Sequence, residues 1–130
     1  GAGCARPAGL LPLSSRSAAW AGEVRQATCG PLGPTSFAMQ IWGVSQVTLP
    51  LNVLVPFSPA GCDLLANADL LIGPSVPVAG QATAQFAIPN SAPLAGASLN
   101  LQVAELEFDL VGNWVGLYAS NGVSMTVGVR

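Results

Sequence analysis

The sequence contains no histidine, and its four basic residues are all arginines (Arg6, Arg16, Arg25 and Arg130), so lysine is absent too. Without histidine no Ser-His-Asp triad can form, and without lysine a Ser-Lys pair is excluded. Cys29 would have no general base to activate it as a nucleophile. We therefore expect no catalytic site and interpret the chain as non-enzymatic.

Charge of either sign is scarce as well. Charged residues make up 8% of the chain, against about 25% in typical soluble domains, while 51% are hydrophobic and mean hydropathy is +0.54. The scattered arginines and the net charge of −2 exclude the basic footprint that nucleic acid requires. So little charge leaves much of the surface poorly solvated, so we expect the chain to bury surface against copies of itself.

Long apolar runs are also missing. Glycine, proline, asparagine or serine interrupts every hydrophobic stretch before it reaches the roughly 18–20 residues of a membrane helix. No transmembrane segment is therefore expected.

The three cysteines, Cys4, Cys29 and Cys62, lack metal-ligand spacing, and no histidine completes a zinc set. Asp63 and Asp69 flank the sequence LLANA, but no dense loop of oxygen ligands with calcium spacing surrounds them. Neither a metal nor a cofactor is expected. In an oxidising compartment, three cysteines would give one intrachain disulfide and an odd thiol, either buried or bonded to another subunit.

What the sequence does contain is a series of short alternating runs separated by turn residues, with no helical period sustained over three turns. The runs predict strands near 17–28, 36–43, 47–55, 62–66, 69–72, 78–88, 97–108, 113–119 and 122–129. Ser-Asn-Gly at 120–122 predicts a tight hairpin between the last two strands, because asparagine and glycine tolerate positive φ. These features predict an all-β fold, an antiparallel β-sandwich of the immunoglobulin-like or jelly-roll-like kind.

Residues 1–16 contain Pro7 and Pro12 and predict an extended N-terminal arm, with 17–130 forming a single sandwich domain. The arm carries three leucines, Leu10, Leu11 and Leu13. An extended arm can add to an open sheet edge of the next subunit, and such head-to-tail exchange propagates into a filament. We therefore predict that these leucines connect subunits.

The sequence contains several further motifs: GAGC at 1–4, WGVSQ at 42–46, LP at 49–50, GCDLL at 61–65, IPNSAPLAGASLNLQVAEL at 88–106 and SNGVSMTVG at 120–128. Together these motifs resemble a group of uncharacterised secreted domains from environmental, planctomycete-type bacteria. The resemblance implies an extracellular β-domain and a Cys4–Cys62 disulfide, with Cys29 as the odd thiol. It implies no activity. A start at Gly-Ala-Gly-Cys without methionine is also typical of a mature secreted form, although a trimmed fragment would look the same.

Three of the six acidic residues, Glu105, Glu107 and Asp109, alternate with apolar residues in VAELEFDL at 103–110. Residues two apart share a strand face, but carboxylates on one open face also share an environment, unlike the acid pairs of glycosidases. The apolar parity switches near Ala104–Glu105, as at a β-bulge that turns the acids outward. We interpret them as a solvated strand face; a Ca²⁺ or subunit-contact role and a catalytic role are the alternatives.

Trp114 and Tyr118 share strand parity. Core packing is the default interpretation for each; exposed on one face they would suit a protein contact or sugar stacking. Together with the three acids they form a candidate contact face. The sequence thus predicts an extracellular, non-enzymatic structural protein that self-associates into a homopolymeric fibre or surface assembly. The alternative is a soluble secreted binding module for a carbohydrate or a cell-surface protein.

Overall fold

The computed structural model describes residues 13–15, 24–33, 35–56, 58, 62–66, 71–75, 77–88 and 96–128. Their strands are β1 (Leu13–Ser15), β2 (Val24–Cys29), β3 (Ser36–Gly43), β4 (Gln46–Pro50), β5 (Asp63–Ala66), β6 (Leu71–Ser75), β7 (Ala82–Ala87), β8 (Ser98–Phe108), β9 (Trp114–Ala119) and β10 (Val123–Thr126). Helix within this part of the chain is limited to the single turn α1 (Leu51–Leu54).

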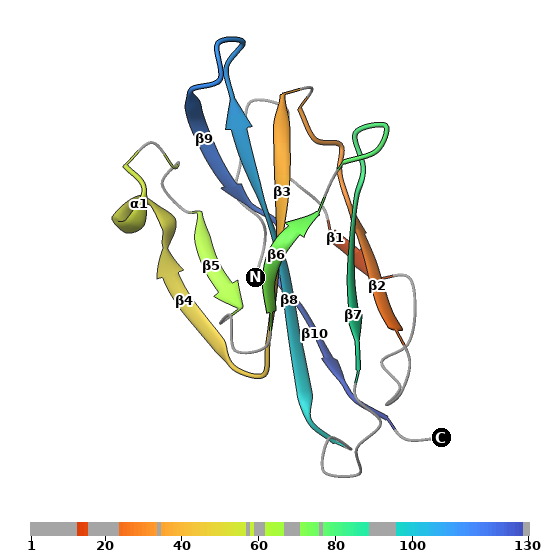
Figure 1. The fold of residues 1–130 in the computed structure, drawn as a ribbon. Helices are drawn as coiled ribbons and strands as arrows, with labels where there is room; N and C mark the ends of the chain where they lie inside the picture. Colours follow the sequence, from red (N-terminus) through yellow and green to blue (C-terminus); the bar gives the residue numbers. More distant parts are fainter. Residues whose placement is uncertain are drawn as a thin grey trace.

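The strands form three antiparallel sheets packed as layers (Figure 1). The central sheet has the order β10-β8-β3-β6, and β9 also pairs with β8. One outer layer is the sheet β1-β2-β7, and the other is the two-stranded sheet β4-β5. The predicted all-β sandwich with almost no helix is confirmed.

The face of the central sheet toward β1-β2-β7 forms the larger core cluster. Trp42 of β3 is fully buried there and stacks on Phe86 of β7, with ring centroids 5.3 Å apart. Small side chains such as Ala27, Ala82 and Ala84 line the facing sheet and leave room for the indole. In GQATAQFAI at 80–88 the apolar residues Ala82, Ala84, Phe86 and Ile88 alternate with polar ones and turn inward, so the alternation marks a core face, as the geometry of a strand predicts.

The opposite face of the central sheet carries a second core cluster, which includes Leu51, Cys62, Ala104, Leu117 and Ala119. The segment containing β4, α1 and β5 covers it. Strand β8 is consequently buried on both faces between residues 99 and 105.

A buried amide ties this second layer down. Gln102 has no exposed surface. Its Oε1 accepts a hydrogen bond from the Leu65 N–H at 2.8 Å, and its Nε2 donates to the carbonyl oxygens of Asp63 (2.9 Å) and Ser120 (3.0 Å). The edge of β5 that faces β8 is thus paired with a side chain instead of a strand.

The expected strand over 47–55 is wrong in its second half, where α1 forms instead. The Val55 N–H donates to the Leu51 carbonyl and the Leu51 N–H donates to the Cys62 carbonyl, both at 2.8 Å. Leu51 is buried in the second core cluster. Tertiary packing of that leucine overrides the local β pattern.

The hairpin expected at Ser120–Gly122 is also wrong. Both β9 and β10 pair with β8: Ala119 lies opposite Ala104, and Val123 lies opposite Leu101. Ser120, Asn121 and Gly122 therefore form a break between two strands that follow the same edge of β8, and none of them has positive φ. The Ser120 N–H donates to the Val103 carbonyl, and the Ser120 hydroxyl accepts from the Val103 N–H, which bridges the break.

A tight turn occurs instead at 78–81, inside the expected strand over 78–88. Ala79 and Gly80 both have positive φ (53° and 77°), as a two-residue hairpin turn requires. Val78 and Gln81 exchange both backbone hydrogen bonds, at 2.8 and 3.0 Å. Ala-Gly is a weaker turn signal than Asn-Gly, so the alternation of residues 78–88 predicted a continuous strand and no turn at this place.

The last part of the N-terminal arm belongs to its own domain. Leu13 pairs with Cys29 across β1 and β2 and is buried in the larger core cluster. Asn121 holds it through both backbone groups: its Oδ1 accepts from the Leu13 N–H at 2.8 Å, and its Nδ2 donates to the Leu13 carbonyl at 3.2 Å. The expectation that Leu13 lies on the next subunit is therefore wrong in this structure; Leu10 and Leu11 lie outside the described residues.

Replacing Gln102 by methionine should lower the free energy of unfolding by about 2–4 kcal/mol, because the buried Leu65 N–H and the carbonyl oxygens of Asp63 and Ser120 lose their hydrogen-bond partner. Methionine has a similar volume, so the substitution leaves the packing largely unchanged. Urea unfolding measures the change, and the exposed Gln85→Met is the matched control. Equal midpoints for the two variants would show that Gln102 does not hold the layers together.

Candidate functional site

The acids of VAELEFDL do not form one solvated face. Glu105 is only 1% exposed, and its Oε2 accepts a hydrogen bond from the Gly33 N–H at 2.9 Å. Glu107 is partly exposed one step further along β8. The interpretation as a wet strand face is therefore wrong for Glu105. That interpretation assumed that one face of the strand meets solvent. Both faces of β8 are covered at Glu105, so the alternation of polar and apolar residues does not distinguish a buried face from an exposed one.

The bulge expected near Ala104–Glu105 is absent from that place. Strand β8 pairs with β3 without interruption from Asn100 to Glu107. The irregularity lies on the other side, against β9, where Glu107 opposes Gly116 and Phe108 opposes Trp114. The parity switch in the sequence instead reflects burial of both faces of one continuous strand.

The candidate contact face is likewise divided. Tyr118 lies opposite Glu105 and is 8% exposed, so both are in the body of the fold. Trp114 is 40% exposed, and its indole N–H donates to the Gly116 carbonyl at 2.8 Å. Only Asp109 and Trp114 of the predicted face reach the end of the molecule where β8 turns into β9.

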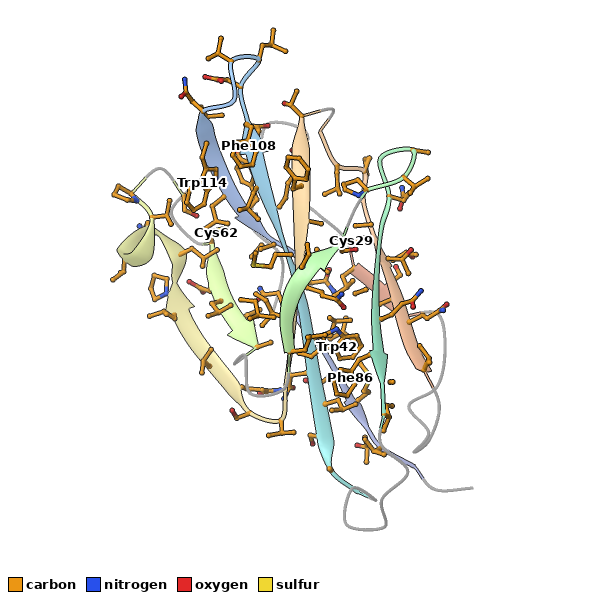
Figure 2. The ribbon with its side chains drawn as sticks, in the orientation of Figure 1. Cys29, Trp42, Cys62, Phe86, Phe108 and Trp114 are labelled. Carbon is orange, nitrogen blue, oxygen red and sulfur yellow. The ribbon has the colours of Figure 1, made fainter. Side chains whose placement is uncertain are left out.

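That end carries the most exposed of the large hydrophobic side chains in the described part of the chain. Leu110 is 95% and Val111 is 81% exposed, at the tip of the β8–β9 hairpin. The hairpin extends past the end of β3 in Figure 1. We name the exposed or partly exposed residues around it the apolar tip: Phe37, Phe108, Leu110, Val111, Trp114 and Val115. Figure 2 shows Phe108 and Trp114 on the strands that lead into it.

Asp109 gives the hairpin a fixed shape. Its Oδ1 accepts hydrogen bonds from the N–H groups of Val111 (3.0 Å) and Asn113 (2.8 Å), and its Oδ2 accepts from the Asn113 side-chain amide (3.2 Å). Gly112 takes positive φ and donates its N–H to the Asp109 carbonyl. The backbone N–H of Asn113, with smaller contributions from its side chain and from Val111 and Gly112, lowers the pKa of Asp109. We call this arrangement the Asp109 clasp.

A hollow of about 720 Å³ lies beside the hairpin. Apolar groups from several segments line it, among them Leu32, Phe37, Pro77, Phe108 and Leu110. The Phe37 and Phe108 rings meet edge to face, with centroids 5.7 Å apart. Phe37 remains 59% exposed, so the hollow and the protruding hairpin form one continuous apolar surface.

The acidic residues and cysteines of the described part of the chain lie apart. No three of them gather into a group that could hold a metal ion. The Ser36 hydroxyl lies beside Gly33, as do the carboxylates of Glu105 and Glu107. This hydroxyl is buried and has no hydrogen-bond partner among the described residues. Asp63 belongs to β5 and Asp69 lies outside the described residues.

The described cysteines are both in the core. Cys29 is a reduced thiol with 1% exposure in the larger cluster, and Cys62 has the same exposure in the second. No disulfide joins two residues of the described part. Cys4 lies outside it, so the Cys4–Cys62 bond stays a prediction.

Comparison with known protein families and with curated proteins finds no match for this chain. The resemblance to secreted bacterial domains therefore stays a prediction too. None of the helical structure in the described ranges is long and apolar enough to cross a membrane.

Non-reducing peptide mapping should recover a Cys4–Cys62 peptide, unchanged in a Cys29→Ala variant. Closing so long a loop restricts the unfolded chain, so reduction should lower the free energy of unfolding by about 4 kcal/mol. A Cys4–Cys29 peptide would refute the pairing and the family resemblance that implied it.

The Asp109 clasp should loosen in acid. The pKa of Asp109 is lowered in the folded state. The ionised carboxylate therefore stabilises the loop fully above the ordinary aspartate pKa, near 4, and this stabilisation is lost as the pH falls through the lower pKa of the folded state. Amide exchange at Val111 and Asn113 should therefore accelerate over that range relative to Val103. An Asp109→Asn variant should show fast exchange already at neutral pH; slow exchange in that variant would mean the carboxylate does not order the loop.

Proposed function

We propose that this chain is a non-enzymatic, extracellular structural protein that self-associates into a homopolymeric fibre or surface assembly. The observation that carries the proposal is the apolar tip. A flexible loop could fold its aliphatic side chains inward, but the Asp109 clasp holds Leu110 and Val111 away from the body. Ordering the loop in advance removes part of the entropy cost of association.

The energetic scale of this contact is modest. Burying a leucine or valine fully is worth about 1.5–3 kcal/mol, so Leu110 and Val111 from two copies would contribute about 6–12 kcal/mol. Association costs about 4–15 kcal/mol in lost translational and rotational freedom. The tip alone therefore supports a weak contact, and a stable polymer needs a second one.

The N-terminal arm is the proposed second contact. Leu13 belongs to its own sheet, so the exchange applies to the residues before it, including Leu10 and Leu11. These would add to an open sheet edge of a neighbouring copy. Extracellular location and the absence of catalysis remain parts of the proposal: they rest on the resemblance, the cysteines and the lack of histidine and lysine.

The alternative function is a secreted binding module for a carbohydrate or a cell-surface protein. The feature that favours it is a groove of about 390 Å³ between β4, β5 and β10, lined partly by Gln46, Thr48, Asn100 and Ser124. The Gln46 amide donates to Asn100 and Ser124 across it. Amides and hydroxyls suit sugar hydroxyls, but the groove lacks an aromatic platform among its lining residues.

Deleting residues 5–12 should abolish or strongly reduce fibres in negative-stain electron microscopy while Leu13–Ser15 keep their place on β2. Replacing Leu10 and Leu11 by serine, with the length kept, is the matched variant and should weaken assembly in the same direction. Fibres that form equally well without 5–12 would show that the arm is not the connector. A wild-type chain that stays monomeric at every concentration would favour the binding module.

A further inference from the structure

The apolar tip contains both a protrusion and a recess. Leu110 and Val111 project from the hairpin, and the hollow of about 720 Å³ opens directly beside them. Leu110 itself forms part of the rim of the hollow. A surface that carries a protrusion and a recess side by side can pair with a copy of itself rotated by 180°, each protrusion entering the other copy's recess.

From this arrangement we infer that two copies dock tip to tip about a two-fold axis, with Leu110 and Val111 of each chain in the hollow of the other. The inference rests on the proposed self-association and names its contact. Such an isologous contact closes at two chains. The two-fold pair is therefore the repeating unit of the assembly, and growth beyond it uses a different contact.

The charges at the tip favour a second copy over other occupants. The described residues that form the tip and line its hollow include no cation and one acidic residue, Asp109. Nucleic acid and anionic membranes would meet no positive charge. A charged protein partner would find only a carboxylate already engaged by its own loop. Because those hydrogen bonds are internal, docking does not have to replace them.

Rigidity of the protrusion supports the same conclusion. The hairpin backbone is held by the Asp109 carbonyl and carboxylate, so its two aliphatic side chains are presented without a prior change of shape. Aromatic rings line the recess at Phe37 and Phe108. Aliphatic side chains entering a pocket with aromatic walls are typical of the centre of a protein interface.

Sedimentation velocity of the full chain between about 1 and 200 µM tests the inference. The wild type should show a two-chain species as the smallest assembly. In Leu110→Ser/Val111→Ser, its dissociation constant should rise at least about tenfold. The matched control, Val44→Ser/Val53→Ser, changes exposed valines away from the tip and should leave it unaffected. Circular dichroism and urea unfolding should show both double variants folded, since the changed side chains are exposed.

A Pro77→Arg variant places a charge in the hollow without changing the protrusion, and should lose the two-chain species as well. If the tip variant assembles like wild type, the inference is wrong and self-association stands. Growth from one chain through odd-numbered species would also overturn the two-fold contact, in favour of head-to-tail docking. A wild type that stays monomeric defeats the proposed function and the inference together. If that monomer binds neutral phosphatidylcholine vesicles through the tip, a membrane is the occupant instead.

Discussion

The buried amide of Gln102 connects β8 to β5, with which β8 has no ladder, and to the break between β9 and β10, where the ladder along β8 is interrupted. Its oxygen accepts from β5, and its nitrogen donates to β5 and to the break between β9 and β10. A side-chain amide offers one acceptor and two donors in a fixed plane, which matches these three groups. The layer β4-β5 and the path of the last two strands along β8 both depend on it.

The opposite layer is attached by the same chemistry. Gln40 of β3 accepts from the Gln85 N–H of β7 at 3.0 Å, and the Ser75 hydroxyl donates to the Thr83 carbonyl at 2.6 Å. These contacts occupy backbone groups on the free edge of β7. Neutral hydrogen bonds thus join the layers in a chain that has few charges, and they avoid the desolvation cost of buried ion pairs. They also make the outer edge of β7, and of no other strand, less available for pairing with another chain.

The large hydrophobic side chains with the highest exposed fractions in the described part of the chain, Leu110 and Val111, lie at the apolar tip. The Asp109 carboxylate accepts hydrogen bonds from the backbone of its own hairpin, and this hairpin conformation leaves Leu110 and Val111 exposed to solvent. Exposed aliphatic side chains on an ordered loop gain free energy only when something covers them. Low charge across the sequence and an apolar protrusion held by hydrogen bonds in the structure therefore support the same proposal, association of this chain with copies of itself.

By itself, the sequence determined the fold class and most strand positions, because period-two alternation reflects the geometry of a single strand. It also limited the catalytic chemistry to mechanisms that need neither histidine nor lysine, since both are absent whatever the fold.

Only the tertiary structure decided which strand faces are covered. Glu105 and Leu106 both lie on a strand enclosed by two layers, so alternation could not reveal that the glutamate is buried. Ser120–Gly122 has the residues of a turn but continues along β8, because hydrogen bonds from Gln102 and Val103 hold it there. The apolar tip could likewise be identified only from the tertiary structure. The exposure of Leu110 and Val111 depends on where the neighbouring segments end, and the local sequence pattern contains no information on that.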